Sequence, residues 1–206
     1  MKNYIIGYGS LMNLSSLNRT LPTIENIEPI YLNGFKRSWN ALENKNNSFS
    51  PTYLGVEIQV GARTNCIIFE LSEEELETMD QREFLYTRKL VNMNDIECVQ
   101  STQISFSKED KIWIYVTNNS SNPNKNYPII QSYVDTCISG CLQLEIEFKM
   151  NNFAIDFIKS TDNWSKYWVN DRIFPRAPHV HQPYAFKIDN LLQSYMSELY
   201  QGIIIE

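Results

Sequence analysis

The chain has 206 residues and a net charge of −6, with 24 acidic side chains against 18 lysines and arginines. This length suits one domain with an elaboration, or two small ones, and a content of 43% hydrophobic residues allows a sizeable core. The negative charge and the lack of a long Lys or Arg run argue against a general nucleic-acid binder, which normally carries a basic patch.

The N-terminus and the cysteines bear on where the protein works. The apolar run near residue 5 is far too short for a signal peptide, and no later stretch is long enough to span a membrane. None of the four cysteines forms a CxxC pair, which favours reduced, buried thiols. We therefore expect a cytoplasmic protein without a membrane partner, with secretion by a route that needs no classical signal left open.

Strands dominate the first part of the chain. Val56, Ile58 and Val60 alternate as in a half-buried strand, and Gly34 interrupts an earlier strand. A loop leading to a short helix follows the first strand. The expected strands cover residues 3–8, 29–39, 53–61 and 65–71, and the polar residues 43–51 form a surface loop.

A helix should begin at Ser72, because Ser72 and Glu75 fit a capping box in which each side chain satisfies a free backbone N–H. At about 100° per residue, Leu76, Met79 and Glu83 share one face of this helix. Two of them are apolar and should face the core, so Glu83 should point inward as well. A buried carboxylate is costly unless it is paired, protonated or useful.

The second half of the chain mixes strands and helices without regular alternation, which predicts an α+β fold. A helix after Pro128 should stop near Gly140. A final helix should begin at an Asp189 cap. The expected strands are 86–93, 96–100 and 111–117, the expected short helices are 153–161 and 164–172, and the proline-rich residues 174–184 form a loop or extended arm.

Two segments could carry chemistry. Gly7 and Gly9 flank Tyr8 directly after a strand, and glycines let backbone N–H groups approach an anion; a plain tight turn is the alternative. Glu83 could act as a general acid or base, because apolar surroundings raise the pKa of a carboxyl group. Its alternative is structural, as the partner of Arg88 or of a tyrosine hydroxyl.

The remaining polar clusters have simpler interpretations. His179 and His181 could face the same way on a strand, but catalytic zinc needs at least three protein ligands and few lie nearby, so we expect no metal. Asp171, Arg172 and Arg176 are expected to form ion pairs that fix the C-terminal arm, in preference to binding substrate.

The motif YGSL, followed much later by LxxMDxREFLYTRKLV, resembles the γ-glutamylcyclotransferase-like superfamily, including its ChaC and AIG2-like branches. The stretches WIYV and PIIQSYVDTCISGC are also similar to that family. The likeness covers residues 1–145. The matching residues are Tyr8, Gly9, Ser10, Leu11, Asp80, Glu83, Tyr86 and Tyr115.

This resemblance implies a small mixed β-barrel with flanking helices over residues 1–145. Residues 146–206 would then be a mainly helical extension packed on the same domain, and we expect it to shape or cover the pocket. The resemblance also implies that Tyr8, Gly9, Ser10 and Leu11, with Tyr86 and Tyr115, bind a γ-glutamyl substrate.

In the chemistry implied by the resemblance, Glu83 takes a proton from the glutamyl α-amine, which attacks the γ-carbonyl and gives 5-oxoproline and a free amine. No cofactor is needed, and we expect a monomer or homodimer. The ChaC branch usually has an aromatic residue shortly after YGSL, whereas MNLSS follows here, so the substrate need not be glutathione. The alternative is a non-catalytic module on the same fold that binds a small molecule or a protein.

Overall fold

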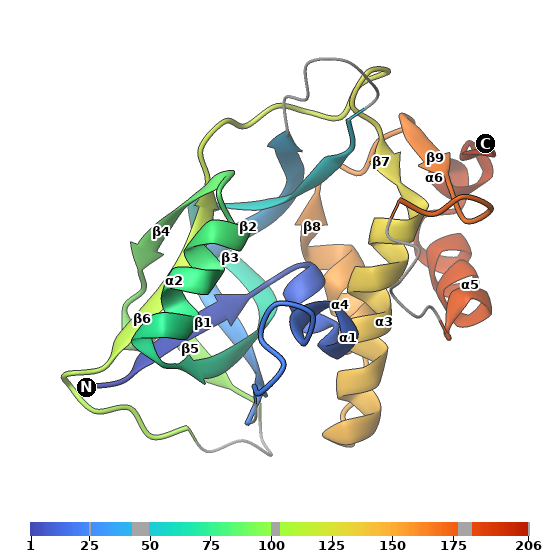
Figure 1. The fold of residues 1–206 in the computed structure, drawn as a ribbon. Coiled ribbons are helices and arrows are strands. Elements are labelled where there is room, and N and C mark those ends of the chain that lie inside the picture. The colour runs from blue at the N-terminus through green and yellow to red at the C-terminus, as the bar shows by residue number, and fades with distance from the viewer. Residues whose placement is uncertain (25, 43–49, 100–103, 177–182, 206) are drawn as a thin grey trace.

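The computed structural model of the chain describes residues 1–24, 26–42, 50–99, 104–176 and 183–205. Its main element is a strongly coiled sheet with strand order β4-β6-β1-β3-β2-β5, to which β8 adds beside β2 (Figure 1). The strands of this sheet are β1 (Asn3–Gly7), β2 (Glu28–Leu42), β3 (Thr52–Leu71), β4 (Tyr86–Leu90), β5 (Ile96–Cys98), β6 (Lys111–Thr117) and β8 (Thr161–Asp162).

The central strand β1 lies between two partners of opposite direction. It pairs antiparallel with β3 and parallel with β6. All five of its residues are buried, as expected of a strand in the middle of a covered sheet. A second, three-stranded sheet contains β7 (Ile129–Ile130), β9 (Trp168–Asn170) and β10 (Ile204–Ile205).

The expected α+β class is confirmed, but the expected β-barrel is wrong. In the part of the chain that the structure describes, β4 pairs with β6 alone and β5 with β2 alone, so the sheet coils without closing. These two end strands are five and three residues long. The curvature instead comes from β2 and β3, which run to 15 and 20 residues and pair along most of their length.

The two strands expected at 53–61 and 65–71 are one strand with an irregular middle. The pairing of β2 with β3 shifts register between Asn33 and Phe35, and Gly61 has a φ of +81°, which favours glycine. Val56 is buried as predicted, but Ile58 and Val60 are exposed, because every residue from Glu57 to Gly61 is exposed and residues 59–62 have no pairing partner on β2.

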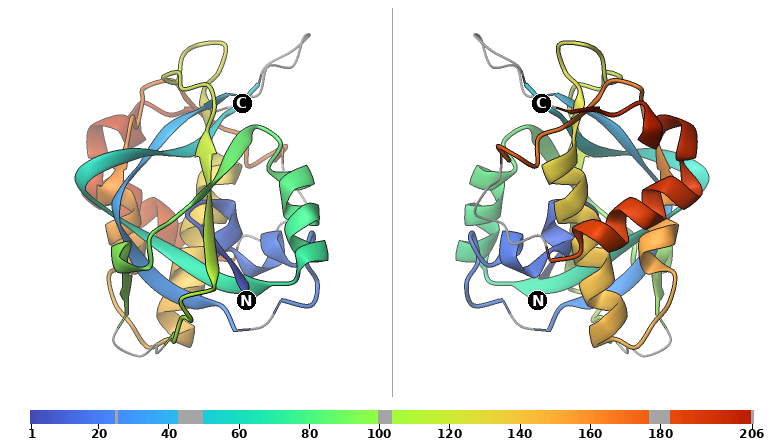
Figure 2. Two further views of the ribbon diagram at one scale, coloured as in Figure 1. Left: turned by 90° about the vertical axis from the view of Figure 1, so that its left-hand side faces the viewer. Right: turned by 90° about the vertical axis from the view of Figure 1, so that its right-hand side faces the viewer.

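Helices α2 and α3 lie on opposite sides of the molecule in Figure 1, with α4 beside α3 and α5 and α6 at the outer edge. The segment that follows β1 lies between α2 and α3 in both views of Figure 2. The helices are η1 (Ser10–Met12), α1 (Leu14–Leu17), α2 (Glu73–Arg82), η2 (Met93–Asp95), α3 (Gln131–Glu147), α4 (Phe153–Ser160), α5 (Ala185–Tyr195) and α6 (Ser197–Gln201).

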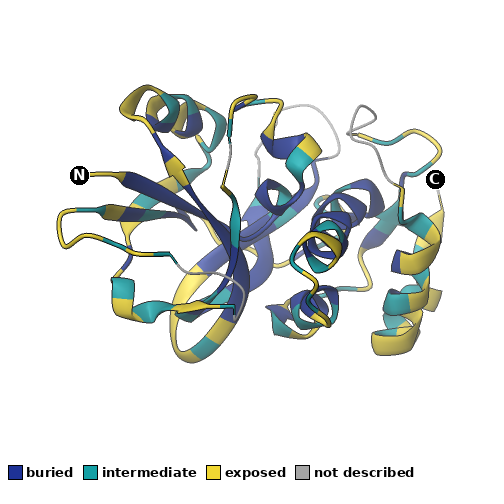
Figure 3. Cartoon of the chain, turned by 90° about the horizontal axis from the view of Figure 1, so that it is seen from below, coloured by how far each residue is buried: buried dark blue, intermediate teal, exposed yellow. Residues whose placement is uncertain are grey.

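Gly140 does not end a helix. Helix α3 continues to Glu147, and a Cβ atom at Gly140 would lie 2.5 Å from the backbone carbon of Met12. The glycine therefore allows the chain after β1 to approach the axis of α3 closely. Figure 3 shows that buried residues are concentrated in the middle of the molecule, whereas exposed residues lie mainly at its edges.

The C-terminal region differs from the expected pattern in two places. Residues 164–172 form no helix, because Trp168 pairs as a β-strand residue with Ile129. The last helical region is split into α5 and α6, and Asp189 lies inside α5 instead of capping it. His179 and His181 lie outside the described residues.

Ion pairs fix the arm after β9, as predicted. Asp171 accepts hydrogen bonds from the backbone N–H and hydroxyl of Ser132, at 2.8 and 2.6 Å, and lies 3.5 Å from Arg176. Arg172 forms ion pairs with Asp135 at 2.7 Å and Asp189 at 2.8 Å. These contacts join the arm to the start of α3.

Candidate active site

The loop after β1 is held rigidly by buried contacts. The hydroxyl of Tyr8 donates a hydrogen bond to the backbone oxygen of Tyr115, at 2.7 Å. The backbone N–H of Met12 donates to the oxygen of Gly9, at 3.0 Å, and starts the short helix η1. Leu11 and Met12 are buried. The backbone of the YGSL motif is therefore fixed from both ends.

A buried arginine supports this loop from behind. Arg37 on β2 is fully buried, and its Nη1 donates to the backbone oxygens of Tyr8 at 3.0 Å and Asn65 at 2.9 Å. Its other nitrogens donate to the side-chain oxygens of Asn65, Ser160 and Thr161, at 2.7 to 2.9 Å. No carboxylate of the described residues forms an ion pair with it. Neutral oxygens replace the water that its charge has lost.

Helix α2 begins as the sequence predicts. Ser72 and Glu75 form both hydrogen bonds of the capping box, and Leu76 and Met79 are buried. Glu83 is the C-cap residue, and its backbone N–H donates to the oxygen of Met79, at 2.9 Å. The face predicted from helical spacing therefore exists, with the carboxylate at its end.

Glu83 is shielded from water, with 17% of its side chain exposed. Burial raises the pKa of this carboxyl above its ordinary value, and the Arg82 guanidinium opposes part of that rise. Arg82 Nε lies 3.1 Å from Glu83 Oε1. The expected structural partners, Arg88 or a tyrosine hydroxyl, are therefore replaced by the neighbouring arginine.

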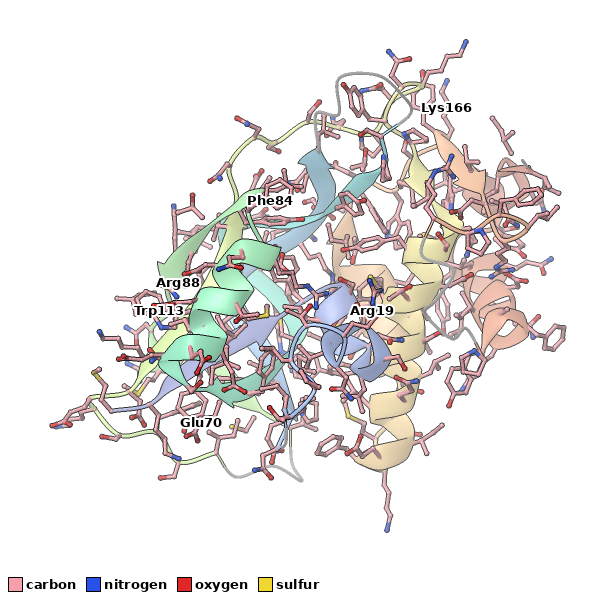
Figure 4. All side chains as sticks on the ribbon, in the orientation of Figure 1. Arg19, Glu70, Phe84, Arg88, Trp113 and Lys166 are labelled. Atoms are coloured by element: carbon pink, nitrogen blue, oxygen red, sulfur yellow. The ribbon has the colours of Figure 1, made fainter. Side chains whose placement is uncertain are left out.

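Arg88 instead belongs to a separate cluster around Asp80. Arg88 lies 3.1 Å from Asp80, which also accepts a hydrogen bond from the Tyr115 hydroxyl at 2.8 Å. The guanidinium of Arg88 packs over the ring of Trp113 (Figure 4). Asp80 thus fixes Tyr115, a member of the predicted site, without itself lining the cavity.

A cavity opens between the loop and Glu83. All seven residues that we predicted for the site line it, and the structure adds Ile6, Leu54 and Tyr133. It is small, with a volume of about 30 Å³ for water-sized molecules, which is room for about two waters. The predicted residues that meet here are Tyr8, Gly9, Ser10, Leu11, Glu83, Tyr86 and Tyr115.

A second, outer cavity of about 200 Å³ shares four lining residues with the first. These are Ser10, Glu83, Tyr86 and Tyr133, and the outer cavity adds Tyr53, Arg82, Phe84 and Leu85. Glu83 is the one carboxylic acid among the described residues that line either cavity. The two cavities therefore adjoin each other, and the acid lines both.

Three tyrosines of the inner cavity are poorly suited to act as bases near neutral pH. Burial raises the pKa of Tyr8, Tyr115 and Tyr133, so their hydroxyls stay protonated. Two of these hydroxyls already donate, Tyr8 to the Tyr115 backbone and Tyr115 to Asp80. Among the described residues that line this cavity, Glu83 is the candidate for proton transfer.

Sequence reasoning missed two residues that shape the site. Tyr133 lies in the stretch PIIQSYVDTCISGC, so its signal was the family likeness of that helix. Arg37 gave no signal, because its partners come from distant parts of the chain. That the C-terminal extension shapes or covers the pocket stays a prediction: the described residues that line the two cavities all lie within 6–133, and the extension meets Arg37.

The described residues contain neither a metal-binding cluster nor a membrane-spanning helix. Within the described parts of the chain, no three His, Cys, Asp or Glu side chains lie close enough together to hold a metal ion. No helix in the described chain is long and apolar enough to cross a membrane.

Comparison with known proteins agrees with this architecture. Residues 5–134 match the family described as gamma-glutamyl cyclotransferase, AIG2-like, and the chain belongs to this family. A solved structure described as a gamma-glutamyl cyclotransferase has a TM-score of 0.55 and 13% identity, covering 77% of this chain and 99% of its own. An uncharacterized protein from Homo sapiens has a TM-score of 0.55 and 14% identity, covering 77% and 98%. No curated protein matches the chain.

Proposed function

We propose that this protein is a γ-glutamyl cyclotransferase that converts a γ-glutamyl amine or peptide to 5-oxoproline and the free amine. One observation carries the proposal: the shielded side chain of Glu83 lines the same small cavity as residues 8–11 of the loop after β1. Membership of the family supports the general activity. The roles of the site residues are those implied by the family resemblance, and the geometry of the cavity supports them.

The reaction needs few chemical groups from the protein. Glu83 accepts a proton from the α-amine of the substrate, whose nitrogen attacks the γ-carbonyl carbon and closes a five-membered ring. The backbone N–H groups of Gly9 and Ser10 stabilise the developing oxyanion. Glu83 then returns the proton to the departing nitrogen, and the γ-amide bond breaks.

The geometry supports this assignment in two further ways. The loop is fixed by Tyr8 and Arg37, which suits a reaction that depends on holding the substrate in a bent conformation. Burial raises the pKa of Glu83, which brings the carboxyl closer to the range in which it can both accept and return a proton.

The proposal also covers location and organisation. The four cysteines are free thiols, three of them buried, which supports the cytoplasm as the working compartment. We propose that residues 146–206 are an extension of the same domain as residues 1–145, because Ser160 and Thr161 bind Arg37 in the core of the sheet.

The direct test is to incubate the purified protein with glutathione, γ-glutamyl amino acids and γ-glutamyl amines, and to measure 5-oxoproline by mass spectrometry. We expect release with at least one compound, and a loss of about 10²–10⁴-fold in kcat for Glu83→Gln. Glu77→Gln on the exposed side of the same helix is the matched control. A folded protein that releases no 5-oxoproline would favour a non-catalytic binding module.

A further inference from the structure

The outer cavity is positioned to receive the part of the substrate that leaves. The inner cavity has room for about two waters, so it can take only one end of a glutamyl group, and the rest of a γ-glutamyl compound must extend into the outer cavity, which adjoins it at Glu83. A glutamyl group held by the loop would therefore direct its γ-amide substituent outward past Glu83. The walls of the outer cavity then decide which substituents fit.

Most of these walls are aromatic or apolar. Tyr53 and Tyr133 meet edge to face, with ring centroids 5.1 Å apart. Phe84 follows the end of α2 (Figure 4), lines the outer cavity and leaves 66% of its surface exposed. Leu85 lines the same space. A ligand that covers Phe84 removes apolar surface from water, which favours binding.

The outer cavity offers no available cation among its described residues. Arg82 is its one basic side chain, and all five guanidinium N–H groups have nearby acceptors. Nε faces Glu83 at 3.1 Å. The two terminal nitrogens donate to Ser16, Thr20 and Ser10, over 2.9 to 3.5 Å. The charge of Arg82 is also balanced by Glu83.

We infer that the leaving group is an amine whose substituent carries an aromatic ring but no charge and no carboxylate. The ring is held against Tyr53, Phe84 and Tyr133. This inference rests on the proposed function. An amino-acid leaving group would bring a carboxylate close to Glu83, and a dipeptide leaving group, such as that of glutathione, would place one further along the outer cavity. No described residue that lines this cavity offers an available cation to either carboxylate, which is unfavourable. An aromatic amine gains apolar contact and meets no like charge.

The reaction is balanced without another reactant. The α-amine nitrogen forms a bond to the γ-carbon, the bond from that carbon to the leaving nitrogen breaks, and one proton passes through Glu83 from the first nitrogen to the second. The products are 5-oxoproline and the aromatic amine. No water is consumed.

Four substrates distinguish the effect of an aromatic ring from the effect of a carboxylate on the reaction. They are the γ-glutamyl derivatives of 2-phenylethylamine, phenylalanine, ethylamine and alanine. We expect kcat/KM for 5-oxoproline release to be highest for the phenylethylamine derivative, by about tenfold or more over each of the others. Phe84→Ala should reduce the ratio of kcat/KM for the phenylethylamine derivative to kcat/KM for the ethylamine derivative. Phe186→Ala, which removes a ring that is 80% exposed on α5, should leave that ratio unchanged.

Two results would overturn the inference in distinguishable ways. The first is that the phenylalanine and alanine derivatives react as well as, or better than, the phenylethylamine and ethylamine derivatives that lack their carboxylate. In that case the outer cavity does not select against a carboxylate, and the proposed function stands without this specificity. If a folded protein releases 5-oxoproline from none of the four compounds or glutathione, the proposed function itself fails, and the inference fails with it.

Discussion

Arg82 and Glu83 are neighbours in the sequence, and their side chains form an ion pair of 3.1 Å at the mouth of the candidate site. Neighbouring residues of a helix point about 100° apart and do not normally meet. Here the helix ends at Arg82, and Glu83 leaves the helical conformation with a ψ of 33°. The end of α2 therefore sets both the position of the Glu83 carboxyl and its partner, Arg82, which opposes the rise in the pKa of that carboxyl.

Replacing Arg82 by Gln should change the pH dependence of the reaction. Arg82 favours the charged form of Glu83, so its loss raises the pKa of that carboxyl further. A general base must be deprotonated, so the acidic limb of the kcat/KM profile should move to higher pH. Arg19→Gln removes the same charge from an exposed position and should leave the limb where it is. An unchanged limb in Arg82→Gln would remove Glu83 as the titrating base.

Glu83→Gln should raise the stability of the protein at neutral pH. The pKa of Glu83 is raised in the folded state above its ordinary value of 4.5, so the folded protein binds this proton more tightly than the unfolded chain. Stability therefore falls as pH rises from 4.5 through the folded value, and the deficit persists above it. Glutamine carries no such deficit and still offers Arg82 an oxygen.

Urea unfolding of wild type and Glu83→Gln at pH 7 and pH 4 measures this effect. We expect the variant to be the more stable protein at pH 7 and the difference to shrink at pH 4. Glu77→Gln controls for the loss of one negative charge. A variant that is less stable than wild type at pH 7 contradicts the prediction.

Gly140→Ala should disturb the site from a distance. The new Cβ would lie 2.5 Å from the backbone of Met12, so α3 and the segment after β1 must separate. We expect a loss of about 1–3 kcal/mol in stability and a lower kcat, since Met12 closes the turn that begins at Gly9. Gly202→Ala is the control, because its nearest neighbour lies at 3.5 Å, an ordinary contact. Equal melting temperatures and rates for both variants would contradict the prediction.

Arg37→Met should be strongly destabilising. Methionine fills a similar volume but leaves the oxygens of Tyr8 and Asn65 buried without their donors, and each such group costs about 1–3 kcal/mol. Arg63→Met, on the neighbouring strand β3, removes an exposed pair with Glu97 and should cost only about 1 kcal/mol. The free energy of unfolding in urea measures both. Equal values would show that the buried hydrogen bonds contribute little.

The sequence predicts those elements whose signals are local. The start of α2 follows from Ser72 and Glu75, and its inward face follows from Leu76 and Met79, all within one helix. The position of Glu83 on the cavity wall follows from the same spacing together with the family resemblance. Its catalytic role stays a prediction.

What the sequence could not predict depends on distant contacts. Gly140 has the local signature of a helix end, but its place is decided by the backbone of Met12. Trp168 lies in a helix-like pattern, but pairing with Ile129 and the packing of its ring on Trp164 make it a strand residue. The role of Arg37 in supporting the site could not be predicted, because its hydrogen-bond partners are distant from it in the sequence.

The contacts of Arg37 also bear on when the loop after β1 folds during translation. Its guanidinium joins the oxygen of Tyr8, near the start of the chain, to Ser160 and Thr161, some three quarters of the way along it. A nascent chain that has not yet released residue 161 from the ribosome lacks two of the acceptors for this buried cation. We therefore expect the YGSL loop to become rigid only late in translation, after nearly all of the large sheet has been made.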